Sequence, residues 1–252
     1  MMPVAAGEGE SGPPVSAARI RSDELARTKL TVIMPVYNER DTVAGVVERV
    51  RRVPMAKELI IIDDGSTDGT SELLDQLAGG EVRVIHQPQN MGKGMAIRRA
   101  LTEATGDVVI IQDADGEYDP TEYPKLVAPI RAGDTAVVYG SRFRGSIENM
   151  RWPNYLINRL LAWMVRVLYR APLTDEATCY KVFRTEVVKS IPLHCRGFEF
   201  CPEVTAKLLK RGYRIQEVPI TYRGRSKREG KKINWKDGLR AIWSLVKYRF
   251  AG

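Results

Sequence analysis

The segment "VVIIQDADGEYDP", residues 108–120, runs four apolar residues directly into two aspartates, Asp113 and Asp115, that are one residue apart. A strand that is apolar on both faces is typical of the interior of a parallel sheet. Two carboxylates this close repel each other unless a cation lies between them, and hard divalent cations such as Mg²⁺ favour carboxylate oxygens. An isolated pair of this kind is also common in a solvated loop. The segment therefore predicts a buried strand, and its surroundings must decide between a loop and a metal site.

The same alternation of an apolar strand and a helix runs through the whole N-terminal half. Strands are expected over residues 29–38, 58–64, 81–87 and 107–113, and helices over residues 40–52, 69–77 and 94–104. A fifth strand is expected over residues 135–142, after which the alternation breaks down. This order is typical of a single α/β domain, in which a mainly parallel, Rossmann-like sheet is covered by helices on both faces.

Polar side chains cluster where these strands end. Residues 37–39 (Tyr-Asn-Glu) follow the first strand, Asp63 and Asp64 the second, and Asp113 and Asp115 the fourth. Ligands of such sheets bind outside the carboxyl ends of the strands. Acids from three strand ends that meet at one edge favour a binding site over a solvated loop.

A glycine-rich turn, "NMGKG" at residues 90–94, precedes the third helix. Backbone amides at a helix start, together with the charge of Lys93, favour phosphate binding. The turn does not follow the Walker pattern, however, and a tight turn alone also explains its glycines. The sequence leaves both interpretations open.

The chain has 252 residues and a net charge of +8, and its positive charge is local. Residues 196–252 contain 15 Lys and Arg against 5 Asp and Glu, an excess of +10, which leaves −2 for the preceding residues. Local positive charge indicates an anionic partner, such as phosphate groups, a membrane surface or nucleic acid.

The first 28 residues are rich in Gly, Pro and Ala without periodicity, so we expect a flexible tail before a domain over residues 29–225. The tail lacks the apolar region of a secretory signal, and no segment approaches the roughly 18 apolar residues of a spanning helix. Three cysteines, Cys179, Cys195 and Cys201, are too few and too scattered for a disulfide framework. A cytosolic location is therefore expected.

The ordered motifs "PVYNE", "DDGSTDGT", "NMGKG", "DAD" and "GSR" resemble those of the family 2 glycosyltransferases of GT-A fold, over residues 30–250. The later segments "RGFEFCPEV" and "KRGYRIQEVPITYRGR" resemble the branch of dolichol-phosphate mannose synthases and polyprenyl-phosphate sugar transferases. The resemblance implies an inverting enzyme that transfers mannose or glucose from GDP-mannose or UDP-glucose to a polyprenyl phosphate. It also implies a divalent metal, Mg²⁺ or Mn²⁺. With no spanning helix expected, the enzyme would act as a peripheral protein at the cytoplasmic face of the membrane.

By this resemblance, the strand ends hold the nucleotide sugar and its metal. The expected donor-binding residues are Pro35, Tyr37, Glu39, Asp64, Lys93, Asp113, Ala114 and Asp115. The expected metal ligands are Asp113, Asp115 and Glu117, although relatives often have a neutral amide in place of Glu117.

Catalytic roles are expected for Asp115, Arg142 and Glu199. Arg142, in the "GSR" motif, is expected beside the donor or acceptor phosphates, where a guanidinium stabilises the charge that develops on the leaving diphosphate. Glu199 is a candidate general base. If the acceptor is a lipid phosphate, its attacking oxygen is already ionised and needs no base, and Glu199 would then orient the sugar or cap the following helix.

The acceptor phosphate is expected at Arg142, Arg223, Arg225 and Lys231, the last of which lies in a basic loop within the final segment, residues 226–252. Two amphipathic helices are expected over residues 155–170 and 235–250, with basic residues between their apolar ones. Such helices either lie on an anionic membrane or bury their apolar stripes in the core. Together with the basic loop, they favour docking on a membrane.

Three alternative functions remain open at this point. The same fold accepts soluble or saccharide acceptors as well as lipids. A phosphatase with Asp113 as its nucleophile also carries an Asp-x-Asp-Gly segment after an apolar strand, but usually in the first strand of its sheet. A nucleic-acid binder would use the basic C-terminal segment, yet it leaves the acidic strand ends unexplained, so no nucleic-acid partner is expected.

Overall fold

The computed structural model of this chain describes residues 28–225 and 235–251, with side chains in the second range from residue 237. The predicted tail, apart from residue 28, and the basic loop with Lys231 lie outside the described residues. The predicted boundaries after residues 28 and 225 stay predictions.

A seven-stranded sheet forms the centre of the molecule, in the order β3-β2-β1-β4-β6-β5-β7. Its strands are β1 (Leu30–Val36), β2 (Lys57–Asp63), β3 (Val82–His86), β4 (Val108–Ile111), β5 (Val137–Glu148), β6 (Lys181–Arg184) and β7 (Ile215–Arg223). Strands β1 to β4 pair in parallel, and so do β5 and β7, whereas β6 is antiparallel to both β4 and β5. The predicted mainly parallel sheet is confirmed. The regular alternation of strand and helix holds for the N-terminal half, and the antiparallel strand β6 belongs to the later part of the chain.

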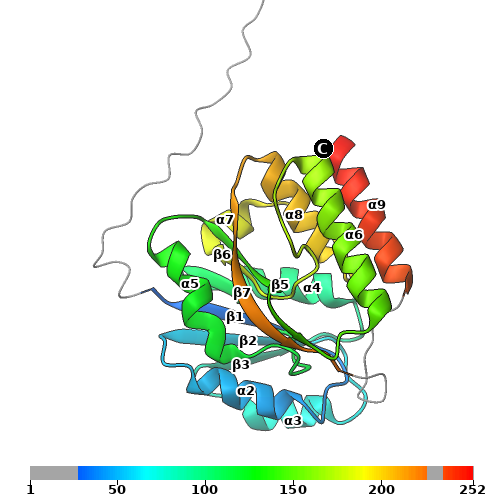
Figure 1. Cartoon of the computed structure of the whole chain (residues 1–252). Helices are drawn as coiled ribbons and strands as arrows, with labels where there is room; N and C mark the ends of the chain where they lie inside the picture. Colours follow the sequence, from blue (N-terminus) through cyan, green and yellow to red (C-terminus); the bar gives the residue numbers. More distant parts are fainter. Residues whose placement is uncertain (1–27, 226–234, 252) are drawn as a thin grey trace, which may run out of the picture.

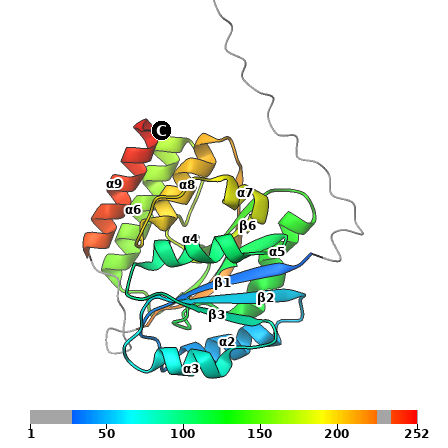
Figure 2. The same cartoon turned by 180° about the vertical axis from the view of Figure 1, so that it is seen from behind.

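The helices are α2 (Val43–Arg52), α3 (Thr70–Leu77), α4 (Lys93–Glu103), η1 (Pro120–Glu122), α5 (Tyr123–Arg131), α6 (Trp152–Tyr169), α7 (Thr185–Ser190), α8 (Phe200–Lys210) and α9 (Trp235–Phe250). Figures 1 and 2 show α2, α3 and α5 on one side of the sheet and α4, α6, α8 and α9 on the other. Helices therefore cover both faces, as predicted.

This double cover explains why the central strands are apolar throughout. Val32 and Ile33 point to opposite faces of β1, and both are fully buried. In β4 the four residues "VVII" are all buried as well. Each such side chain contributes roughly 1.5–3 kcal/mol by leaving water. The chain becomes polar only after it leaves the sheet at Ile111.

Strand β5 is longer than the predicted strand over residues 135–142, because it continues alongside β7 beyond the centre of the sheet. The pairing of β5 with β7 shifts register between Ser141 and Ser146. Gly145 lies in this irregular part, directly against the backbone of Ile220, where a side chain would overlap the neighbouring strand. The extension leads the chain from the sheet to the start of α6.

Helices α6 and α9 pack side by side, and both begin at the end of the molecule where β7 ends (Figures 1 and 2). Their outer sides carry large apolar residues between 41% and 79% exposed: Trp152, Leu156, Leu160, Trp163 and Val167 in α6, and Leu239, Trp243 and Phe250 in α9. The core contacts of α6 are made by other residues, such as Leu161 and Val165. Both amphipathic helices are thus confirmed, with much of their apolar stripes facing outward. Among the described residues, the helices are too short or too polar to cross a membrane.

Candidate active site

Asp113 and Asp115 lie just past the end of β4, where the chain leaves the buried sheet. Lys93 Nζ, from the start of α4, contacts Asp113 Oδ1 at 2.5 Å. Burial, followed by the nearby carboxylates of Asp113 and Glu117, raises the pKa of Asp115 to about 7. Because clustered acids of this kind repel one another, a cation at their side stabilises the ionised form. The electrostatics of this strand end therefore suit a divalent ion.

Arg225, just after β7, joins the ends of three strands. Its Nη1 and Nη2 donate to the carboxylate of Glu39, after β1, at 2.8 and 3.0 Å. Its Nη2 also lies 3.4 Å from Asp115 Oδ2, after β4. The side chains of Arg225 and Glu39 are only 13% and 10% exposed, so this ion pair is largely shielded from water. Glu39, predicted to bind the nucleotide sugar, is thus in direct contact with Arg225, predicted to bind the acceptor phosphate.

Glu117 connects the same strand end to β7. The Tyr222 hydroxyl donates to Glu117 Oε2 at 2.7 Å, and the backbone amide of Arg225 donates to Glu117 Oε1 at 2.7 Å. The backbone amide of Arg223 donates to the Glu117 carbonyl at 3.0 Å. Both carboxylate oxygens therefore have a donor from the β7 end, a relation that the sequence did not indicate.

The three predicted metal ligands, Asp113, Asp115 and Glu117, lie close enough after β4 that burial and the other two carboxylates together raise the pKa of Asp115. Across residues 28–225 and 235–251, no three Asp, Glu, His or Cys side chains converge as ligands of one ion. Asp113 and Asp115 nevertheless offer the hard oxygen ligands that Mg²⁺ and Mn²⁺ prefer. Mg²⁺ is commonly held by one or two carboxylates, with the remaining positions filled by substrate phosphates and water. Asp113 and Asp115 therefore fit a divalent ion whose other ligands are substrate phosphates and water. The role of Glu117 as a ligand stays a prediction.

Asp64 holds the glycine-rich turn in place. Its Oδ1 accepts from the backbone amide of Met91 at 2.7 Å, and its Oδ2 accepts from that of Gly92 at 2.8 Å. Gly92 has a φ of +96°, which residues with side chains rarely adopt. A Cβ on Gly94 would lie 2.9 Å from the carbonyl oxygen of Gly197. The glycines are therefore required by the tight fit of this turn, which directs Lys93 toward Asp113.

The other acid of the second strand end points elsewhere. Asp63 accepts from the Ser71 hydroxyl at 2.6 Å and contacts His86 Nδ1 at 2.8 Å. The first and second strand ends are joined by Asn38, whose side chain accepts from the Thr67 amide at 2.8 Å. Only Asp64 of the pair therefore faces the glycine-rich turn.

The remaining donor-side residues frame this edge of the sheet. Pro35 is near the end of β1 and partly buried, Tyr37 is partly buried in the loop after it, and Ala114 is buried between the two aspartates. Their predicted contacts with the nucleotide stay predictions.

Arg142 is buried against Asp175 rather than open to the site. Its Nε and Nη2 donate to the two carboxylate oxygens of Asp175, both at 2.7 Å, and its guanidinium lies 5.1 Å from the centre of the Tyr222 ring. Burial opposes the charge of Arg142, but Asp175 raises its pKa, so the guanidinium stays charged. The Asp175 loop is in turn fixed by Glu217, which accepts from the backbone amides of Thr174 and Asp175 at 2.8 and 2.9 Å. Sequence reasoning missed Glu217 and Tyr222, although Tyr222 directly precedes the predicted Arg223.

Glu199 turns back on its own loop. Its Oε1 accepts from the backbone amides of Arg196 and Gly197, both at 2.9 Å. Burial opposes ionisation, but these amides lower the pKa of Glu199 below its usual value. Both donors precede α8, and the Glu199 side chain accepts no hydrogen bond from an amide of that helix. The carboxylate therefore holds the loop before α8, while its predicted part in catalysis stays a prediction.

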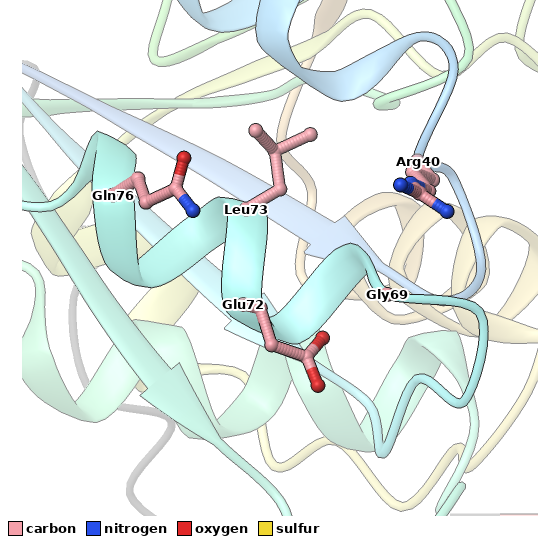
Figure 3. Close-up of a pocket in the computed structure, with 5 residues that line it drawn as sticks. All are labelled: Arg40, Gly69, Glu72, Leu73 and Gln76. Atoms are coloured by element: carbon pink, nitrogen blue, oxygen red, sulfur yellow. The ribbon is translucent and has the colours of Figure 1, made fainter.

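A separate surface hollow of about 370 Å³ lies at the start of α3. Figure 3 shows Arg40 beside Gly69, with Leu73 and Gln76 further along the helix. Its lining includes none of the predicted site residues. The acids at the end of β4 are therefore the better candidate for the reaction centre.

A family model described as glycosyl transferase family 2 matches residues 31–191 of this chain. The dolichol-phosphate mannosyltransferase of Pyrococcus furiosus is 32% identical over 234 residues, in a match that covers 87% of this chain and 64% of that protein. The polyprenol monophosphomannose synthase of Mycolicibacterium smegmatis is 30% identical over 247 residues, in a match that covers 90% of this chain and 89% of that protein. The chain therefore spans less than two thirds of one of these relatives and most of the other.

Among solved structures, a similar chain is the glucosyl-3-phosphoglycerate synthase of Mycobacterium tuberculosis in complex with Mn²⁺, UDP and glucosyl-3-phosphoglycerate. The TM-score is 0.71 at 21% identity, covering 91% of this chain and 84% of that one. At this level of identity the likeness concerns the fold, which is of the predicted GT-A type.

Proposed function

The chain belongs to glycosyl transferase family 2 and is a glycosyltransferase, and from this premise we propose that it transfers mannose or glucose from a nucleotide diphosphate sugar to a polyprenyl phosphate. One observation carries the proposal. Asp113, Asp115 and the shielded Arg225 lie at the end of the sheet where two helices with exposed apolar stripes begin. A phosphate carried on a lipid needs such a charged site beside an apolar surface. The names of the two relatives, a dolichol-phosphate and a polyprenol enzyme, support the same acceptor class.

Asp113 and Asp115 would hold a Mg²⁺ or Mn²⁺ ion, which supplies charge neutralisation for the diphosphate as its bond to the sugar breaks. Lys93 fixes the orientation of Asp113 through its contact with Oδ1. Arg225 adds a guanidinium that is already desolvated and positioned before the donor arrives. Because GDP-mannose and UDP-glucose present the same diphosphate, these residues serve either donor.

Attack by the acceptor oxygen on the face opposite the leaving diphosphate inverts the anomeric centre. An α-linked donor therefore gives a β-linked sugar phosphate. A phosphate oxygen is already ionised at neutral pH, so the reaction requires no general base. The engagement of Glu199 by two backbone amides supports a reaction in which that carboxylate removes no proton.

We place α6 and α9 on the membrane surface. Trp163 and Trp243 are 59% and 65% exposed, and exposed basic residues such as Arg166 and Lys247 lie on the same helices. Tryptophan and basic side chains together are typical of helices that lie at an anionic interface. The three cysteines are free, in keeping with a peripheral enzyme at the cytoplasmic face.

The test is a transfer assay with a panel of nucleotide sugars, a polyprenyl phosphate in detergent, and Mn²⁺ or Mg²⁺. We expect transfer from one donor, loss of transfer when the metal is chelated, and loss of metal-dependent nucleotide binding in Asp115→Asn. The matched control is Asp119→Asn, because Asp119 caps η1 by accepting from the Thr121 amide. Unchanged turnover in Asp115→Asn would overturn the mechanism.

Flotation with anionic vesicles separates the lipid acceptor from a soluble one. We expect the protein to float with vesicles that contain anionic lipid, and to lose this association when Trp163 and Trp243 are replaced by Ser. Transfer to a soluble acceptor without any flotation would favour the same fold acting on a soluble or saccharide substrate.

A further inference from the structure

A series of side-chain contacts runs from Glu117, in the loop after β4, toward the surface. The Tyr222 hydroxyl donates to Glu117 at 2.7 Å, and the Tyr222 ring lies 5.1 Å from the guanidinium carbon of Arg142. The same guanidinium lies 6.0 Å from the centre of the next side chain, the ring of Phe143. Arg142 thus lies near both the Tyr222 ring, whose hydroxyl binds Glu117, and the Phe143 ring.

The line continues to the surface through α6. The rings of Phe143 and Tyr155 meet edge to face at 5.3 Å, and those of Tyr155 and Trp152 stack at 5.9 Å with an angle of 11°. Arg159 lies over the Phe143 ring at 5.2 Å. Phe143, Tyr155 and Trp152 form what is called below the α6 aromatic cluster. Its outer member, Trp152, is 67% exposed.

We propose that the α6 aromatic cluster is the subsite for the isoprenoid units nearest the phosphate of the acceptor, an inference that rests on the proposed function. The acceptor has an anionic end and an unsaturated apolar chain. The row of contacts matches that order, with the exposed guanidinium of Arg159 over the inner ring and stacked, exposed rings at the outer end. Exposed rings of this size favour an apolar ligand that covers them.

The cluster differs from the general membrane contact of the same helix. Trp163 is similarly exposed, at 59%, but lies about 16 Å further along the α6 axis. In the described part of the chain, ring contacts connect the inner site to Trp152 and none connects it to Trp163. Trp163 therefore provides a matched exposed tryptophan on the same helix.

The experiment compares Trp152→Ala with Trp163→Ala in detergent micelles, where binding to a bilayer plays no part. Two acceptors are used: a long-chain polyprenyl phosphate and a phosphate with only two isoprene units. With both acceptors, Trp152→Ala is expected to raise KM about tenfold more than Trp163→Ala does, as the loss of one aromatic contact on binding implies. Trp152→Phe, which keeps a ring, is expected to recover most of this loss. Because both tryptophans are exposed, thermal unfolding of the variants should match that of the unsubstituted protein.

Equal changes of KM in the two alanine variants, or no change in either, would overturn the subsite and leave the proposed function in place. If the unsubstituted protein transfers sugar to neither polyprenyl phosphate, the proposed function fails first, and the subsite fails with it. If Trp163→Ala weakens vesicle flotation but leaves KM unchanged, the result would support separate roles, with Trp163 in membrane contact and the α6 aromatic cluster in acceptor binding.

Discussion

Arg225 and Glu39 form a two-pronged ion pair, with N–O distances of 2.8 and 3.0 Å, although 186 residues separate them in the chain. Glu39 follows the first strand and Arg225 follows the last, so the pair links the two ends of the domain sequence at one edge of the sheet. Since Arg225 also lies 3.4 Å from Asp115, a single guanidinium positions the acids on which the proposed reaction depends.

We predict that Arg225→Ala lowers kcat/KM for sugar transfer by about 30-fold or more, because truncating one member of a buried charge pair costs roughly 2–5 kcal/mol. The matched control is Arg223→Ala. Arg223 is 77% exposed and lies 3.9 Å from Glu148, so the loss should be less than tenfold. Steady-state kinetics with both substrates measure the two effects. Equal losses in the two variants would show that the arginines act through general positive charge.

The contact between Arg142 and Asp175 gives a second prediction, on stability. Asp175→Ala should lower the free energy of unfolding by about 3–5 kcal/mol, because it leaves a buried guanidinium without its partner. Urea denaturation measures this change. The control is Glu148→Ala, which removes an exposed carboxylate and should change stability by less than about 0.5 kcal/mol. A loss below 1 kcal/mol in Asp175→Ala would mean that water reaches Arg142 readily.

A double variant separates the structural role of Arg142 from its predicted catalytic role. Replacing both partners by apolar residues, as in Arg142→Met with Asp175→Leu, should recover most of the stability that Asp175→Ala loses. Transfer activity should remain lost if the guanidinium acts on the phosphates. Recovery of both stability and activity would show that Arg142 has a structural role and no catalytic one.

The strands and their ends were predictable because local sequence determines them. In β4, four consecutive apolar residues identify a strand buried on both faces, and the polar residues that follow identify its carboxyl end. The parallel order of the first four strands then brings the acids to one edge without any further information. Periodicity and spacing therefore placed the Asp113–Asp115 pair at a strand end, whereas they left the turn with Lys93 open between a phosphate site and a simple tight turn.

The partners of the site residues were not predictable in this way. Nothing near Arg142 in the sequence indicates that Asp175, 33 residues later, takes up its guanidinium. The same holds for Glu117 and the Tyr222 hydroxyl, which are 105 residues apart. Both pairings involve β7, which pairs with β5 and carries Tyr222 and the Glu217 that holds the Asp175 loop. This strand comes after the regular alternation of strand and helix has ended, so local sequence does not indicate its partner.

Two glycines provide a further prediction on stability. Gly94→Ala should destabilise the protein by about 1–3 kcal/mol, since a Cβ there overlaps the backbone of residues 196–197. Gly45→Ala is the control, because Gly45 lies on the exposed side of α2 with nothing within 4 Å of the added methyl group. It should stabilise the protein by about 0.5–1 kcal/mol through helix propensity. Thermal unfolding distinguishes the two signs, and destabilisation by both substitutions would contradict the packing argument.

Glu58 gives a prediction on pH dependence, remote from the active site. Burial alone would raise the pKa of Glu58, but hydrogen bonds from Thr31, Thr105 and Lys29 outweigh it and lower the pKa from 4.5 to about 2. The ionised carboxylate therefore stabilises the fold fully above about pH 5, and this contribution is lost as the pH falls from 4.5 toward 2. Allowing for solvent screening, we expect it to amount to about 2 kcal/mol.

The measurement is urea unfolding of the unsubstituted protein and of Glu58→Gln between pH 7 and pH 3. The variant should be less stable by about 2 kcal/mol at pH 7, and the difference should narrow steadily below pH 4.5 because the carboxyl of the unsubstituted protein becomes protonated. Glu48→Gln is the control, since Glu48 forms an exposed ion pair with Arg52 within one helix and should change stability by less than about 0.5 kcal/mol. A difference for Glu58→Gln that stays constant from pH 7 to pH 3 would show that the shape of the side chain, and not its charge, holds β1, β2 and the turn before β4 together.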